Sequence, residues 1–579
     1  MKRKVIAQFF LAFCFILASF FSHGQQVTID TLKPTFGILG KSDTLHRFSQ
    51  SSNGVFPIMD TKFPSISNPF LRYLPLGSFL HPQIVNTLSP KYIALPFVGF
   101  AYVFGSHGSQ HINLAYHQSF RGGWIFNNSF LSHAGGGMIR NNYWQYRTLN
   151  SSLFRVGKRN TFSLQLQTLS DSRPFSLGLQ QPLLANDFTI DLLPVRKDSC
   201  RADWKIKSME VTNSLRLAKD SLSPLRLFQS SSIHSKTRNF DEYDTLAGWY
   251  PLVQGDSLRT KDRYEYVAMQ HQLGLSYVRG PLSLYTGPHV RYWRARFNGI
   301  QSDSSEWGVN LGFTWMKQSL KIQGQYDKNF IGAYGEQRAQ LMVHYAKDSL
   351  LHWRGTLAFG RTAPDVFQRW YNGNTVSYQL MNPTSQTFFV LNLSLQGQRN
   401  GYKYRIYFQG LQTQGVYQFD GLAWTNQASS SECTLGGLGG DLDFSVRGFR
   451  IRPGILCVWD SEKKFPISTV DLLVNKTFLV KKPKNLQFFT TLDLSYCTGF
   501  NPLAIHPAVS AFDFESATTK NKGYMSLVTL VGFKVQTFRF FLSGTNLGYF
   551  FQPNANELFQ NYPLPPWQIK VGITWDFWN

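Results

Sequence analysis

Apolar and polar residues alternate along most of this chain, from about residue 92 to the C-terminus. In the segment 307–315, one face carries Trp307, Val309, Leu311, Phe313 and Trp315, whereas the other carries glycine, asparagine and threonine. Successive side chains of a β-strand point to opposite sides of the sheet, so this period of two predicts a strand with one apolar face. Residues 320–327 repeat the pattern after a short turn, which predicts a hairpin.

The connections between such segments alternate between short and long. The short ones lie near 121–123, 157–160, 279–281, 317–319, 347–349, 398–401 and 481–485, and the long ones near 171–200, 236–261, 361–386, 411–439, 498–522 and 547–566. Outer-membrane barrels have short periplasmic turns and long extracellular loops. The chain is therefore predicted to be an all-β protein, a large antiparallel transmembrane β-barrel of roughly 18–22 strands with both ends in the periplasm.

The last strand carries the clearest pattern. Its apolar face consists of Ile569, Val571, Ile573, Trp575 and Phe577, and Lys570, Gly572, Thr574 and Asp576 lie on the other face. An apolar, aromatic face suits contact with lipid, which predicts a C-terminal membrane-insertion strand. A secreted β-sandwich also alternates, but its polar face is usually richer in charge than the glycine, asparagine, glutamine, serine and threonine found here.

The N-terminus has the features of a secretory signal. Lys2, Arg3 and Lys4 precede an apolar run at 5–21, and small residues follow at Ser22 and Gly24. This order predicts a signal peptide at 1–24. Residues 25–91 alternate weakly and contain many prolines and serines, which favours a periplasmic or lumen segment. The barrel is expected to occupy 92–579.

Composition agrees with a barrel that folds in a membrane. Aromatic residues make up 16% of the chain and charged residues only 16%, while the formal net charge is +24. We expect outer-membrane lipid and lipopolysaccharide, the barrel-assembly machinery and small polar solutes as partners. Nucleic acid is not expected, because the chain is exported and has no run of five basic residues.

Several basic residues occupy polar-face positions of the predicted strands and are therefore expected to line a pore: Lys321, Arg338, Arg354, Lys403, Arg405, Arg539 and Lys570. Fewer acidic residues share that face, namely Asp327, Asp443, Asp493 and Asp576. Rings of lysine and arginine favour anions in a pore, which predicts an anion preference. The alternative is that the excess charge lies on rims and loops and binds anionic lipid head groups.

Motifs for catalysis or metal binding are absent from the sequence. The segment 37–42 approaches a phosphate-binding loop but has Thr35 in place of the first glycine, and neither H-E-x-x-H nor G-x-S-x-G occurs. Cys200, Cys433, Cys457 and Cys497 are widely spaced, so their pairing stays open. We expect no enzymatic activity, no cofactor and no metal site.

Four stretches resemble a known family. They are Leu45-His46-Arg47-Phe48, the segment 105–124 (G-S-H-G-S-Q-H-I-N-L-A-Y-H-Q-S-F-R-G-G-W), the segment 363–374 (A-P-D-V-F-Q-R-W-Y-N-G-N) and the C-terminal end from Tyr562. Together they resemble the Gram-negative "putative porin" family of outer-membrane β-barrels, although Ser377-Tyr378 stands where a tryptophan is expected. The resemblance implies an outer-membrane location and a pore role without catalytic residues.

Two functions are predicted. The first is a porin-like barrel that allows diffusion of small polar solutes, with a preference for anions. The alternative is a non-conducting outer-membrane barrel that acts as an assembly, secretion or anchoring partner.

Overall fold

The computed structural model describes residues 93–578 with internal gaps. The gaps are 94, 137–138, 141–142, 158, 177, 181–192, 218–223, 244–249, 251–252, 333–335, 348–350, 365, 381–383, 400, 416, 420–423, 427–431, 461–467, 481–485, 499–503, 507, 510, 514–522, 551–556, 560 and 564–566. The predicted signal peptide at 1–24 and the segment 25–91 lie outside the described residues.

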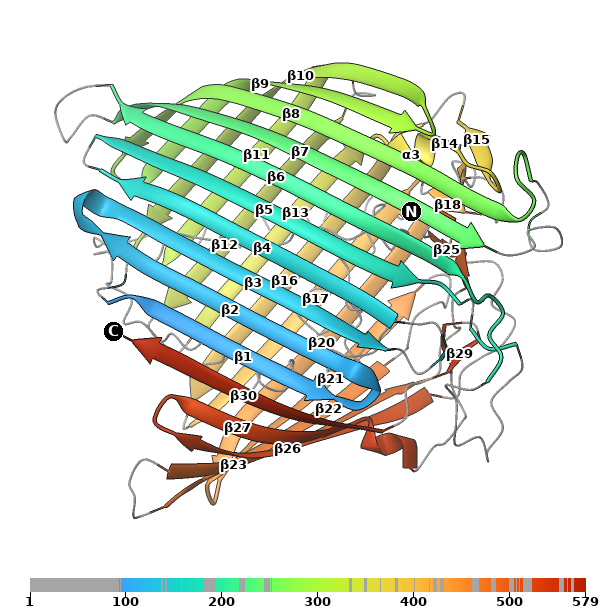
Figure 1. Cartoon of the computed structure of the whole chain (residues 1–579). Helices are drawn as coiled ribbons and strands as arrows, with labels where there is room; N and C mark the ends of the chain where they lie inside the picture. The colour runs from blue at the N-terminus through green and yellow to red at the C-terminus, as the bar shows by residue number, and fades with distance from the viewer. Residues whose placement is uncertain are drawn as a thin grey trace, which may run out of the picture.

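Twenty-two strands form one closed antiparallel sheet (Figure 1). The first eleven are β1 (Phe97–Gly105), β2 (Ser109–Phe120), β3 (Trp124–Gly136), β4 (Tyr143–Val156), β5 (Asn160–Pro174), β6 (Cys200–Arg216), β7 (Leu225–Tyr243), β8 (Arg259–Arg279), β9 (Leu282–Phe297), β10 (Ile300–Lys317) and β11 (Leu320–Ile331). The others are β12 (Gln337–Lys347), β13 (Leu351–Thr362), β16 (Gln386–Arg399), β17 (Tyr402–Gln414), β20 (Glu432–Val446), β21 (Phe449–Asp460), β22 (Ser468–Leu479), β23 (Leu486–Thr498), β26 (Gly523–Val535), β27 (Phe538–Thr545) and β30 (Gln568–Trp578).

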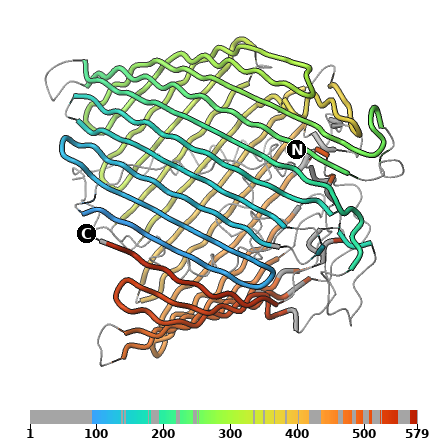
Figure 2. Tube along the Cα trace, viewed as in Figure 1, coloured from blue at the N-terminus to red at the C-terminus, as the bar shows by residue number. Residues whose placement is uncertain are grey.

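Each barrel strand pairs with the next barrel strand, and the first and last strands close the sheet. Phe97 of β1 lies opposite Trp578 of β30, and Gly105 lies opposite Lys570. Figure 2 shows these blue and red segments side by side. The predicted transmembrane β-barrel is therefore confirmed. Among the described residues, no helix has both the length and the apolar character needed to cross a bilayer.

The two ends of the barrel differ as the sequence predicts. The short connections, such as the one between Lys317 and Leu320, lie at the end where the C-terminus lies, which we call the turn end. The long connections lie at the opposite loop end. Two connections at the loop end are short, however, namely residues 106–108 between β1 and β2 and residues 298–299 between β9 and β10. Between β9 and β10 only Asn298 and Gly299 intervene, with φ of 41° and 90°, because an Asn-Gly pair accepts the positive φ of a tight hairpin turn.

The alternation separates an outer face from an inner face. On β8, Val267, Met269 and Leu275 point outward and are exposed, whereas Tyr264 and Tyr266 point inward and are buried. The outward positions 267–277, which are apolar or aromatic except for His271, span about 25 Å at the usual rise and tilt, which matches a bilayer core. β8 is 21 residues long, so its first part, 259–265, rises above the apolar band at the loop end.

Several long connections carry structure of their own. The connection 363–385 contains helix α3 (Val366–Arg369) and the hairpin β14 (Trp370–Asn372) with β15 (Ser377–Gln379). A four-stranded sheet joins two other connections through β18 (Tyr417–Phe419), β19 (Trp424–Asn426), β24 (Ala504–His506) and β25 (Ala511–Asp513). Short elements complete the set: η2 (Ser106–Gly108), η3 (Arg121–Gly123), η5 (Leu547–Phe550), β28 (Glu557–Phe559) and β29 (Tyr562–Pro563).

The largest apolar core lies inside the loop end of the barrel. It combines inner-face residues of β6 to β9, such as Phe240 and Phe297, with residues of the long connections, such as Phe175, Phe367 and Val509. All five side chains are almost completely buried. The connections therefore fold into the mouth of the barrel and pack on its inner wall.

Candidate functional site: a basic chamber inside the barrel

The connection 363–385 forms a roof inside the loop end. In Figure 1, α3, β14 and β15 lie beside the loop ends of the long green strands. Phe367 packs edge-on against Tyr264, with ring centroids 5.3 Å apart, and Tyr371 lies 4.2 Å from the ring of Phe297. Aromatic burial on the inner wall therefore anchors this roof.

Asp262 of β8 fixes the roof through hydrogen bonds. The Tyr371 hydroxyl lies 3.0 Å from Asp262 Oδ2 and 2.9 Å from the carbonyl oxygen of Ala508, so one hydrogen is shared between two acceptors. The backbone N–H of Asn374 and the side-chain amide of Asn298 both donate to Asp262 Oδ1, at 3.1 and 3.0 Å. Burial raises the pKa of Asp262, although these three donors oppose that shift. The carboxylate is thus a junction between the barrel wall and two connections.

Other polar contacts tie further connections to the same wall. Lys197, which precedes β6, forms a fully buried ion pair with Glu242 of β7, and the Tyr250 hydroxyl donates to Glu242 Oε2 at 3.0 Å. His506 of β24 lies with its ring centroid 5.9 Å from that of Tyr250. Burial, followed by the positive charges of Arg238 and Lys197, lowers the pKa of His506 to about 4. Neutral His506 is therefore the form that suits the packed mouth.

A cavity of about 420 Å³ lies below the roof, inside the barrel. It is lined by Trp204, Ser232, His234, Lys236, Tyr264, Tyr266, Ala268, Gln270, Arg291, Arg338 and Phe367. We call it the basic chamber, because four of these side chains are basic or imidazole groups. They come from the inner faces of β7, β9 and β12, while Phe367 of α3 closes the chamber from the loop end.

Positive charge exceeds negative charge in the basic chamber. The Arg291 guanidinium lies 3.5 Å from Glu306 Oε2 and donates to the Tyr266 hydroxyl at 2.7 Å, so Glu306 offsets one cation. Within the described ranges, no carboxylate oxygen lies within 4.0 Å of the side-chain nitrogens of Lys236 or Arg338. The chamber can therefore attract a small anion and offer it hydrogen-bond donors.

The basic residues predicted to line a pore occupy inner-face positions but are not brought together. Lys321 and Arg354 lie opposite His344, one on each side, and Arg338 lines the basic chamber. Arg338 also lies opposite Asp327 on the neighbouring strand.

The other predicted basic residues lie on distant strands. Arg405 of β17 pairs with Asp441 at 2.5 Å, and Lys403 lies opposite Asp443. Arg539 of β27 lies opposite Thr574 of β30. Three further predicted residues occupy inner-face positions: Lys570, Asp493 and Asp576. Carboxylates thus accompany several of these cations around the wall, and a single ring does not form.

The C-terminal strand has its apolar residues outside. Ile569, Trp575 and Phe577 are exposed, and Val571 and Ile573 lie between them on the same outer face. Lys570, at 2% exposure, points inward. Among the described residues, no group of three or more His, Cys, Asp or Glu side chains is arranged to hold a metal ion. Cys200 is a buried free thiol, and Cys457 is free and exposed.

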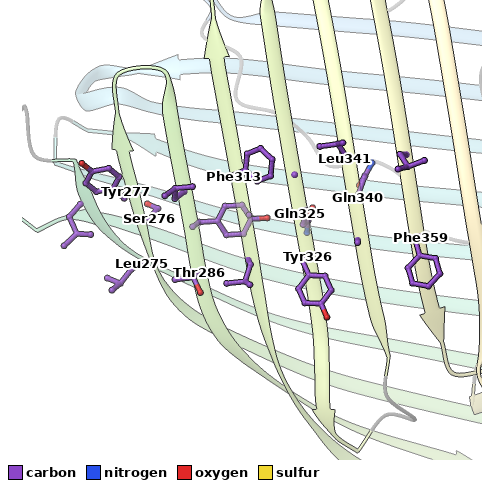
Figure 3. Close-up of a pocket in the computed structure, with 18 residues that line it drawn as sticks. Leu275, Ser276, Tyr277, Thr286, Phe313, Gln325, Tyr326, Gln340, Leu341 and Phe359 are labelled. Carbon is purple, nitrogen blue, oxygen red and sulfur yellow. The ribbon is translucent and has the colours of Figure 1, made fainter. Parts of the chain in front are cut away.

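A second cavity, of about 720 Å³, lies on the outer surface and not in the lumen. Figure 3 shows Leu275, Phe313, Tyr326, Leu341 and Phe359 along neighbouring strands around it. Its walls are exposed apolar side chains, and the small residues at 324 and 339 leave the groove between them. A groove of this kind on a membrane-facing wall suits lipid acyl chains, and it is separate from the basic chamber.

His234, Lys236 and Arg291 were not predicted as site residues. Their strands carry charged and polar residues on both faces near the loop end, so the apolar alternation is weak there and does not assign faces. One signal was available, since the segment 363–374, which resembles the family's central loop, supplies Phe367 and Tyr371 of the roof. Its aromatic composition could have indicated an inward position.

Comparison with known proteins identifies the family. A family model described as "Putative porin" matches residues 183–579. The chain belongs to this family. No curated protein matches the sequence.

Solved structures share the architecture at low sequence identity. The FrpB iron transporter from Neisseria meningitidis (F3-3 variant) is 8% identical with a TM-score of 0.57, covering 84% of this chain and 82% of that one. The siderophore receptor PirA from Acinetobacter baumannii is 11% identical with a TM-score of 0.57, covering 83% and 80%. The copper transporter OprC is 11% identical with a TM-score of 0.59, covering 84% and 81%. These likenesses concern the fold alone.

Proposed function

We propose that the protein is a non-enzymatic outer-membrane channel of a Gram-negative bacterium that passes small polar solutes and prefers anions. The observation that carries this proposal is the basic chamber, where Lys236 and Arg338 face the lumen and, among the described residues, neither has a carboxylate oxygen within 4.0 Å, although Asp327 lies opposite Arg338. Cations in a confined space of low dielectric raise the local concentration of anions.

The inward-folded roof adds selectivity to this proposal. Because Phe367 and Tyr371 narrow the lumen at the loop end, a solute must pass beside the chamber or displace the roof. Entry of a small anion is thus favoured by charge and limited by size. We propose the same route for uptake from outside, since the long loops of such barrels face the exterior.

Reversal potentials in a salt gradient across planar bilayers test the anion preference. The wild-type current should prefer anions, and the variant K236Q/R338Q should lower the anion-to-cation permeability ratio towards one. The matched control is R279Q/K317Q, which removes two outward-facing cations at the turn end and should leave the ratio unchanged. A cation-selective wild-type current would refute the proposal.

A second function is favoured by the packed mouth. Because three long connections share a core with the inner wall, the barrel could act without conducting, as an assembly, secretion or anchoring partner. A folded protein that inserts into bilayers but carries no current, even after the roof is loosened, would support this second function.

A further inference from the structure

Three exposed cations cluster on the outer face of the barrel. Arg147 of β4 lies opposite Ser170 of β5, which in turn lies opposite Lys205 of β6, and Lys207 lies opposite Thr168 on the same strands. All five side chains are exposed and point outward. We call them the outer basic cluster.

The outer basic cluster lies at the loop-end edge of the apolar band. Leu149 and Met209 follow on the same outward faces towards the turn end, with Leu166 between them on β5, and all three are exposed. Adjacent strands are about 4.8 Å apart, so the backbones of Arg147 and Lys205 lie about 10 Å apart, and Lys205 and Lys207 about 7 Å. One lipid head group can therefore reach all three cations.

Nearby acidic residues do not neutralise the cluster. Asp203, which also points outward on β6, accepts from Arg201 Nε at 2.9 Å and from the Ser172 hydroxyl. In the part of the chain that the structure describes, no carboxylate forms an ion pair with Arg147, Lys205 or Lys207. Three neighbouring cations repel one another unless an anion lies between them.

We infer that the outer basic cluster binds the phosphate groups of an anionic lipid in the leaflet at the loop end. Arginine and lysine donate charge-assisted hydrogen bonds to phosphate oxygens, and the hydroxyls of Thr168 and Ser170 lie between the cations as further donors. The exposed leucines and methionine towards the turn end meet the acyl chains. The position at the edge of the apolar band selects a lipid over a dissolved anion, because only a lipid satisfies both parts of the surface.

Binding of a bisphosphorylated glycolipid to the folded full-length protein, held in neutral phosphocholine nanodiscs, tests this inference. The variant R147Q/K205Q/K207Q should bind about a hundredfold more weakly, from the usual contribution of a basic residue near an anionic surface. The single variant K205Q should bind about fivefold more weakly. It replaces the triple variant in the binding measurement if the triple variant folds poorly. The dephosphorylated glycolipid should bind the wild type as weakly as the intact lipid binds the triple variant.

The matched control is R279Q/K317Q/K347Q, which removes the same charge from outward positions at the turn end. It should bind like the wild type. Equal loss in both triple variants would overturn the inference, because it would indicate a general effect of net charge. So would wild-type affinity in the cluster variants. Displacement of the lipid by inorganic phosphate at equal concentration would assign the site to a free anion and would also overturn it.

Discussion

Removal of one hydroxyl should loosen the roof. Tyr371 is fully buried, and its hydroxyl is shared between the Asp262 carboxylate and the Ala508 carbonyl. In the variant Y371F the ring contacts remain, but both acceptors lose this donor. Because a hydrogen bond to a charged group contributes about 1.5–3 kcal/mol, we expect the docked roof to lose about 2–3 kcal/mol relative to the undocked roof. The undocked fraction should rise roughly 30- to 150-fold.

Hydrogen–deuterium exchange of peptides covering 366–380 measures this equilibrium without assuming a current. In Y371F, amide exchange in these peptides should accelerate roughly 30- to 150-fold, while exchange in the central part of β8 should stay unchanged. In planar bilayers, openings should become correspondingly more frequent if the roof also limits conduction.

The control is Y378F in the same connection. Tyr378 is also buried, and its hydroxyl donates to the carbonyl oxygen of Phe367 at 2.6 Å. Since both partners belong to the roof, this bond survives undocking and its loss should leave the docking equilibrium largely unaltered. Equal acceleration in Y371F and Y378F, with normal heat-modifiable migration of both, would refute the role assigned to Asp262.

Three further predictions concern the closing strand and the mouth. Val571→Lys places a charge on the lipid face and should cost about 2–4 kcal/mol of unfolding free energy in vesicles, whereas Gln323→Lys on an inner face should cost far less, as urea titration would show. Gly572→Ala should cost about 1–3 kcal/mol, since a Cβ there would lie 2.2 Å from the fully buried Phe541 ring; an unchanged urea midpoint would contradict this. Because the folded pKa of His506 is lowered to about 4 from 6.5, its neutral form stabilises the mouth above pH 6.5, and this stability is lost as the pH falls through about 4. The protection factors of the amides at 504–506, which correct for the intrinsic exchange rate at each pH, should fall at pH 4, and H506N should abolish that fall.

The barrel itself could be predicted from the sequence, because strand alternation and connection length are local properties. The pattern of 307–315 specifies which side chains face lipid, and the short turn at 317–319 specifies the partner strand. Register then follows, since a slip by one residue would invert both faces. The position of the long connections has no such local signal. In the sequence, Phe367 and Tyr371 are aromatic residues of a predicted loop without a signal for burial. The structure explains their burial, because they pack on the inner wall formed by β8 and β9.

The basic chamber illustrates the same limit in its electrostatics. Lys321, Arg338 and Arg354 could be assigned to the inner face by alternation, but their neighbours across the lumen could not. The structure shows Arg338 sharing a cavity with Lys236, which lies five barrel strands away along the chain, whereas Arg405 is offset by Asp441 on the adjacent strand. Curvature of the closed sheet determines which charges meet, and sequence spacing does not encode that curvature.

The cations of the chain therefore lie on two opposite faces of the barrel wall. Alternation along the sequence assigns a cation to one of these faces only when the register of its strand is known. Lys205 and Lys236 occupy neighbouring strands, and Lys236 lies opposite Ile206, the residue next to Lys205. One of these lysines faces lipid and the other faces the lumen, because adjacent positions on a strand point to opposite sides. A slip of β6 against β7 by one residue would place Lys205 opposite Lys236, and both lysines would then lie on the same face. We therefore expect K205Q to weaken lipid binding without changing ion selectivity, and K236Q to weaken ion selectivity without changing lipid binding. Both results follow from the same register, because the two proposed sites lie on opposite faces of the same wall.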